Sequence, residues 1–170
     1  MTKDPAGWAY NLLVLLHIIC AVAGFGAVVY RGFLLEVARR RGAAGAAEAG
    51  VLAVYGQVSQ FAEILIYGVV VFGLAALGEE GHSSNFGKAW VVAALVVYFV
   101  MVGLLHGMVR PAERDYRRTM LALAQAPPVK PPARPPELDR LDGLYRRISA
   151  GTGLFNVLLL GALYLMVFKP

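Results

Sequence analysis

Residues 8–31 read WAYNLLVLLHIICAVAGFGAVVYR, and this stretch decides the fold. It holds no Asp, Glu, Lys or Arg before Arg31, and one histidine, His17. At a rise of about 1.5 Å per residue, a helix of this length crosses a hydrocarbon core roughly 30 Å thick. Its apolar run exceeds the roughly 7–15 residues of a signal peptide, and Lys3 with Asp4 gives no net positive charge ahead of it. We therefore predict a transmembrane helix that the mature protein retains.

The composition indicates that the chain is an integral membrane protein. Hydrophobic residues make up 58% of the 170 residues, and the mean hydropathy is +0.61. Soluble globular domains are usually about 45–50% apolar. The single cysteine, Cys20, excludes an intrachain disulfide, so helix packing must hold the fold together.

The pattern of apolar runs predicts a single all-α domain, an antiparallel four-helix bundle of the integral membrane type. Charged amphipathic helix extensions are expected on the cytoplasmic side. Glycines within the spans, among them Gly24, Gly68, Gly73, Gly151 and Gly153, are expected to let helix backbones approach closely. The predicted spans are residues 8–30, 59–78, 89–110 and 149–168, with a cytoplasmic connection over 111–148 that contains a proline-rich linker at 127–136.

The basic residues set the expected orientation. Of the 16 Lys and Arg, four fall in the first connection and nine in the third, whereas Lys3, Lys88 and Lys169 lie at the opposite ends of the spans. The positive-inside rule places both basic connections in the cytoplasm and both termini outside, in a bacterial inner membrane. Trp8 and Trp90 fall at the outer boundaries, where indole rings are favoured. Nucleic acid is not expected as a partner, because no binding motif accompanies the arginines.

Polar residues within the spans form two layers at different depths. The inner layer pairs Glu63 with His106, either as a structural clasp or as a proton-handling pair. The outer layer holds His17, with Tyr98 at similar depth and Cys20 one turn along the same face. By helical rise, the two histidines differ in depth by about 10–15 Å, which argues against one haem bound by both.

His17 has three interpretations. It is a core histidine hydrogen-bonded to Tyr98 or a backbone carbonyl, or it binds a haem b alone or with another partner such as Tyr98. The pair of His17 and Cys20 also suggests a soft metal such as copper, although no third ligand is evident. The chain has no nucleotide-binding loop, HExxH motif or GxSxG elbow, so catalysis is not expected.

Four segments carry a resemblance: LLVLLHIICAVAGFG, SQFAEILIYGVVVFG, LLHGMVRPA and LMVFKP. Together they resemble a bacterial family of predicted integral membrane proteins catalogued as a domain of unknown function. The first segment is also similar to the first helix of copper-resistance D proteins and of haem-containing membrane protoporphyrinogen oxidases. The latter resemblance implies haem binding at the position of His17.

We therefore interpret the chain as an accessory or redox-linked membrane component with a haem b site at His17 as one hypothesis. The alternatives are a haem-dependent oxidase of porphyrinogen type and a component of copper or small-solute transport. The lipid bilayer is the expected partner, together with other membrane proteins or a second copy of the chain.

Overall fold

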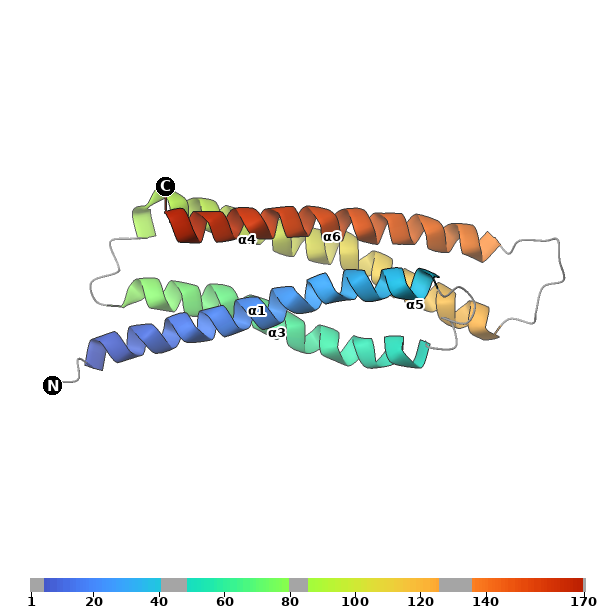
Figure 1. Ribbon diagram of the computed structural model, residues 1–170, viewed down its shortest axis with the longest axis horizontal. Coiled ribbons are helices and arrows are strands. Elements are labelled where there is room, and N and C mark those ends of the chain that lie inside the picture. Colours follow the sequence, from blue (N-terminus) through green and yellow to red (C-terminus); the bar gives the residue numbers. More distant parts are fainter. Residues whose placement is uncertain (1–4, 41–48, 80–85, 126–135, 170) are drawn as a thin grey trace.

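The computed structural model describes residues 5–40, 49–79, 86–125 and 136–169, and these residues are almost entirely helical. Four long helical rods lie side by side and alternate in direction (Figure 1). Each rod contains a segment that is long and apolar enough to cross a membrane. The prediction of an all-α protein with four such segments is confirmed. The segments are Gly7–Phe33, Phe61–Gly78, Ala89–Ala122 and Glu137–Phe168.

Helices α1 (Pro5–Arg40) and α3 (Ala49–Gly78) form one closely packed pair. Glycines make this approach possible: a Cβ on Gly24 would lie 3.0 Å from the backbone nitrogen of Ile66, and one on Gly68 would lie 2.8 Å from Sγ of Cys20. At 36 and 30 residues, both helices exceed the roughly 20 residues that a bilayer requires. Each is therefore longer than a membrane span requires.

The third rod joins three elements without a break: α4 (Ala89–Leu104), the π-helical segment η2 (Leu105–Val109) and α5 (Arg110–Gln125). The π segment ends at Val109, two residues before Pro111. Proline lacks the N–H that an α-helix needs, and its ring clashes with the carbonyl four residues earlier. A wider turn at this point relieves both problems, and the backbone N–H of Arg110 donates to Leu105 O, five residues back. The helix therefore continues through Pro111.

Helix α6 (Pro136–Phe168) forms the fourth rod and packs against α4 and α5. Pro136 occupies the first position, where its missing N–H costs nothing, and Glu137 and Asp139 in the first turn favour the positive end of the helix dipole. The helix begins 13 residues before the predicted span at Ser149, so the end of the predicted connection is helical. The rest of the predicted proline-rich linker lies outside the described residues.

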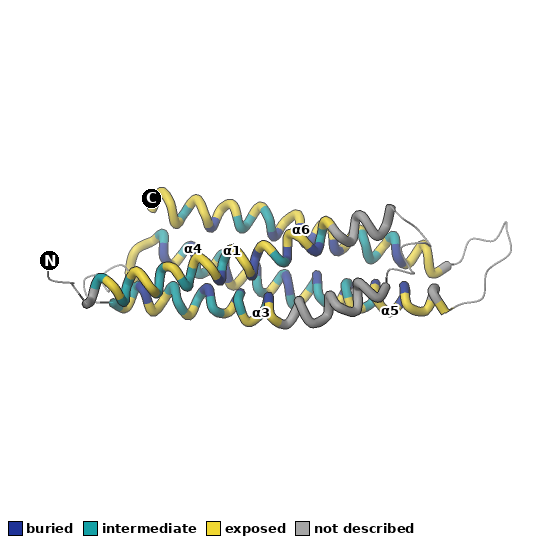
Figure 2. The backbone as a smooth tube through the Cα atoms, turned by 60° about the horizontal axis from the view of Figure 1, so that its bottom comes forward, coloured by how far each residue is buried: buried dark blue, intermediate teal, exposed yellow. Residues whose placement is uncertain are grey.

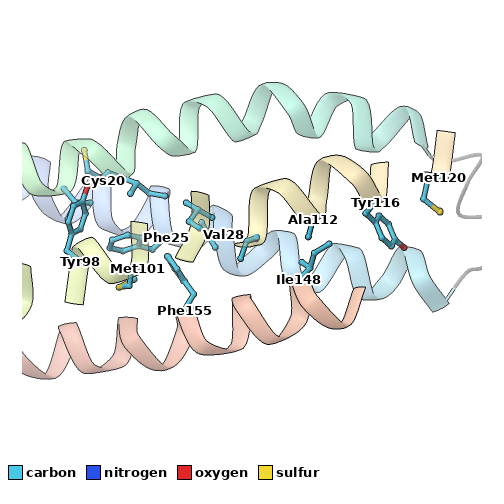
Figure 3. Packing of buried hydrophobic residues seen from close by; sticks show 14 of the residues in the cluster. Cys20, Phe25, Val28, Tyr98, Met101, Ala112, Tyr116, Met120, Ile148 and Phe155 are labelled. Carbon is cyan, nitrogen blue, oxygen red and sulfur yellow. Dashed lines mark hydrogen bonds between the residues drawn. The ribbon is translucent and has the colours of Figure 1, made fainter. Parts of the chain in front are cut away.

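The core runs along the inside of the four rods, and exposed residues face outward (Figure 2). Its largest fully buried side chains are Phe155, Ile66, Met101, Leu105, Ile148 and Val109. Phe25 and Phe155 meet edge to face, with ring centroids 5.7 Å apart, and so join α1 to α6 (Figure 3). Many large apolar side chains stay exposed, as expected of a surface that contacts lipid: Trp8, Val22, Phe61, Val71, Phe99, Val157 and Val167 are all more than half exposed.

Candidate functional site

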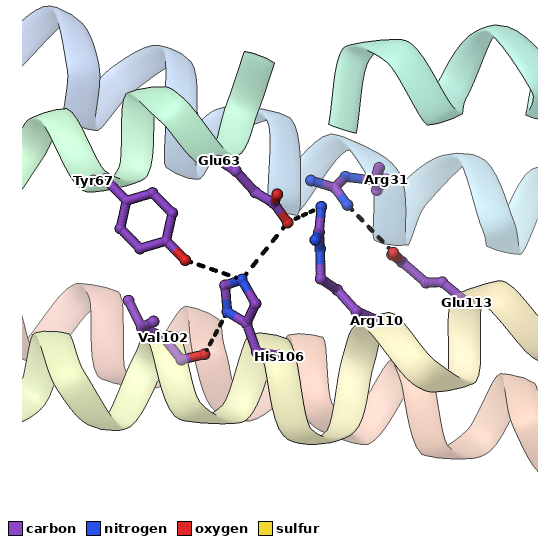
Figure 4. A network of polar contacts seen from close by, with 7 residues as sticks. All are labelled: Arg31, Glu63, Tyr67, Val102, His106, Arg110 and Glu113. Carbon is purple, nitrogen blue, oxygen red and sulfur yellow. Dashed lines mark hydrogen bonds and ion pairs between the residues drawn. The ribbon is translucent and has the colours of Figure 1, made fainter. Parts of the chain in front are cut away.

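A network of charged and polar side chains links α1, α3, η2 and α5 (Figure 4). Arg110 forms an ion pair with Glu63, and Nη1 of Arg31 lies 3.3 Å from Oε2 of Glu113. The Arg31 side chain is only 5% exposed, and that of Glu63 is 19% exposed. Such groups are costly to bury unless they are paired, so these ion pairs account for their position inside the protein.

His106 extends this network toward the protein surface. Its Nδ1 lies 2.9 Å from Val102 O, one turn earlier on the same rod. A carbonyl oxygen can only accept, so Nδ1 carries the hydrogen and donates it. The hydroxyl of Tyr67 lies 3.2 Å from Nε2, and Oε1 of Glu63 lies 3.7 Å from the same nitrogen. The imidazole therefore connects the buried ion pairs to the half-exposed tyrosine.

The expected pair of Glu63 and His106 is close in space, but the nearer partner of Glu63 is Arg110. The predicted inner layer contained neither Arg31 nor Arg110. The spacing in the sequence could have indicated this network, because Glu63 and Tyr67 are four residues apart, as are His106 and Arg110. Each pair therefore shares a helix face, and the two faces meet.

His17 belongs to a separate site between α1 and α3. Its Nδ1 lies 2.7 Å from Val69 O, and its ring fills the space beside Gly73, where a Cβ would lie 2.9 Å from Nδ1. The partner of His17 is thus a backbone carbonyl, one of the two expected. Within the part of the chain that the structure describes, no protein group is hydrogen-bonded to Nε2 of His17.

Tyr98 and Cys20 lie near this site, but neither is hydrogen-bonded to the His17 imidazole. The Tyr98 hydroxyl donates to Ile66 O at 3.0 Å and so does not serve as the partner of His17. Cys20 is buried, and its thiol fits against Gly68. Among the described residues, no three His, Cys, Asp or Glu side chains are grouped to hold a metal ion.

The two histidines contact α3 at different levels, as expected from the two predicted layers. His17 meets α3 at Val69 and Gly73, whereas His106 meets it at Glu63 and Tyr67. Along the helix, these contacts are centred about six residues, or roughly 9 Å, apart. The arrangement supports two independent sites.

Comparisons with known proteins found no matching family model, no matching curated protein and no matching solved structure.

Proposed function

We propose that this chain is a non-catalytic, accessory protein of the bacterial cytoplasmic membrane, a four-span antiparallel bundle with both termini outside. The main support for this proposal is the distance along the third rod between an aromatic residue, Trp90, and a charged residue, Arg110. Trp90 stands at the start of α4, and Arg110 follows the π segment 20 residues later. At about 1.5 Å per residue the two are roughly 30 Å apart, which matches the hydrocarbon thickness.

A contact near one end of this rod and a group of exposed arginines toward the other support the proposed orientation. Lys169 Nζ lies 5.5 Å from the centre of the Trp90 ring, so the end of α6 and the start of α4 share one boundary. Beyond Arg110 at the other end, the exposed residues include Arg114, Arg117 and Arg118. The positive-inside rule assigns this second end to the cytoplasm.

The accessory role follows from how the polar network is balanced. Arg31 pairs with Glu113, and Arg110 pairs with Glu63, so two cations and two anions compensate each other. These groups join helices rather than converge on one reacting atom, in contrast to the expected arrangement of a catalytic centre. The exposed apolar faces supply the contacts with lipid or with other membrane helices.

Labelling of single cysteines tests the orientation. In a Cys20→Ser background, we expect a membrane-impermeant maleimide to label Gly87→Cys and Lys169→Cys in intact spheroplasts. Arg117→Cys and Arg147→Cys, at exposed positions of α5 and α6, should react only after permeabilisation. The reverse pattern would overturn the proposed orientation, and labelling of all four in intact cells would overturn the four-span arrangement.

One observation favours a second function, the binding of haem b by His17. Histidines that bind a metal usually donate their other ring N–H to a carbonyl or carboxylate, which fixes the tautomer. His17 makes this bond through Nδ1 to Val69 O, which leaves the Nε2 lone pair available as a ligand. A haem there would provide redox chemistry, while the protein would orient the imidazole.

Absorption spectra of the purified protein, oxidised and then reduced with dithionite, test this second function. A Soret band that is lost in His17→Ala and retained in His106→Ala supports the haem site. Metal analysis of the same samples tests the copper alternative at His17 and Cys20. A colourless, metal-free preparation from haem-replete cells would contradict both.

A further inference from the structure

One ring nitrogen of His106 has a fixed hydrogen-bonding role, whereas the other can either accept or donate a hydrogen bond. Nδ1 donates to Val102 O, and this carbonyl cannot donate in return. Neutral His106 therefore has its lone pair on Nε2, where it accepts the hydroxyl hydrogen of Tyr67. Any additional proton must bind to Nε2.

Glu63 is positioned to respond to that proton. Its Oε1 already pairs with Arg110 and lies 3.7 Å from Nε2, too far for a hydrogen bond but within reach of a small side-chain movement. Once Nε2 carries a hydrogen, the nearest anionic acceptor is this same oxygen. The Tyr67 hydroxyl must then turn, because it can no longer donate to Nε2.

Charged or titratable groups surround His106 on α1, α3 and α5. Helix α1 contributes Arg31, and α3 contributes Glu63 and Tyr67. Helix α5 contributes Arg110, Glu113 and the exposed Arg114, which lies near Arg110. Helix α6 meets η2 through Gly151, which lies against Val109, and Gly151 is flanked by the non-titratable residues Ala150 and Thr152. The four ion-paired groups, Arg31, Glu63, Arg110 and Glu113, have formal charges that sum to zero, so proton uptake would bring this paired cluster to +1.

We propose that Glu63, Tyr67 and His106 form a proton-binding site in which uptake on Nε2 of His106 moves the Glu63 carboxylate from Arg110 alone to a position shared with the imidazolium. A proton from water forms a new N–H bond at Nε2, no electrons are transferred, and release is the reverse step. The His106 side chain is 36% exposed on the surface of the bundle. His106 lies four residues before Arg110, and the proposed cytoplasmic boundary at Arg110 gives it access to water.

This site goes beyond the accessory role and does not depend on haem at His17. If the proposed orientation holds, the proton comes from the cytoplasmic side. His106 belongs to η2 of the third rod, and Glu63 belongs to α3. Binding of the proton would therefore alter the contact between the third rod and α3. It would thus give the bundle a response to pH.

Histidine nitrogen spectra of the labelled protein in micelles provide the first test. At neutral pH we expect the His106 signals, assigned by their loss in His106→Gln, to show hydrogen on Nδ1 and none on Nε2. Tyr67→Phe should move the Nε2 signal and leave the Nδ1 signal in place. A hydrogen on Nε2 at neutral pH, or no proton uptake by His106 between pH 8 and pH 5, would overturn the proposal.

Infrared difference spectra between pH 8 and pH 5 test the response of Glu63. We expect a change in carboxylate stretching that is lost in Glu63→Gln and equally lost in His106→Gln, because the carboxylate responds to the imidazole. Asp115→Asn, which removes an exposed carboxylate paired with Arg118, is the matched control and should retain the change. Persistence of the change in His106→Gln would show that Glu63 titrates independently and would overturn the coupling. If His106→Gln does not fold, the Tyr67→Phe spectra still decide whether Nε2 has the assigned role.

Discussion

At the scale of single residues, two glycines of α6 have different surroundings. A Cβ on Gly151 would lie 2.7 Å from Cγ2 of Val109, whereas one on Gly153 would have no neighbour within 4 Å. Valine has little freedom to turn its side chain within a helix, so the clash at Gly151 must move backbone. We expect Gly151→Ala to cost about 1–3 kcal/mol of stability, as measured by thermal unfolding in micelles.

Gly153→Ala is the matched control, two positions along α6. It should be neutral or slightly stabilising, because alanine favours a helix by up to about 1 kcal/mol over glycine. Equal melting temperatures for the two variants would show that α6 does not pack against η2 as described.

A substitution at Arg31 is also expected to reduce the stability of the protein strongly. Its side chain is 5% exposed and pairs with Glu113, so Arg31→Met would leave a poorly solvated carboxylate without this partner. Breaking a buried pair in this way costs about 3 kcal/mol. We expect a clear fall in melting temperature, partly recovered in the double variant Arg31→Met with Glu113→Gln.

Arg118→Met is the control for this loss of charge. The Arg118 side chain is 79% exposed, and its distance to Asp115 is 3.9 Å. Exposed pairs contribute about 0–1 kcal/mol, so little change is expected. A similar loss in both variants would contradict a special role for the buried arginine.

At the scale of elements, the π segment and Pro111 form one unit. The wide turn at residues 105–109 compensates for the missing N–H of proline, and it also carries His106. We expect Pro111→Ala to raise the melting temperature, since a regular α-helix becomes available. The gain should be smaller than the roughly 3 kcal/mol cost of proline in an unadapted helix.

The same variant should disturb the contact between His106 and Tyr67, because a change of helical register turns the imidazole. Histidine nitrogen spectra would report this change at Nε2. Pro136→Ala, at the first position of α6, should leave stability and spectra unchanged. A Pro111→Ala variant with wild-type spectra would show that the π segment does not depend on the proline.

The elements themselves could largely be predicted from sequence, because a membrane span needs only length and apolar composition. Pairing within the polar layer could not, since it depends on how each helix is rotated about its axis. Arg110 therefore emerged as the closer partner of Glu63, and Tyr98 was found bonded to Ile66 O. Similarly, sequence alone did not separate the close approach at Gly151 from the open position at Gly153.

At the scale of the whole molecule, the protein consists of two helix assemblies. Helix α1 packs mainly on α3, and α6 packs on α4 and α5, while contacts of α1 with α6 and of α3 with α5 are less extensive. The ion pairs Arg31–Glu113 and Glu63–Arg110 both cross between these assemblies. Because these side chains are largely buried, such pairs favour one docking geometry over others.

Opposite charges join the two assemblies partway along the four rods, and a reciprocal exchange of charge tests this account most directly. Glu63→Arg brings three arginines together, and Arg110→Glu brings three glutamates together, so each single variant should lose most of its folded, monodisperse protein in size-exclusion chromatography. We expect the double variant Glu63→Arg with Arg110→Glu to recover a substantial part of that yield and of the melting temperature. Single variants as stable as the wild type, or a double variant no better than the worse single one, would contradict the claim.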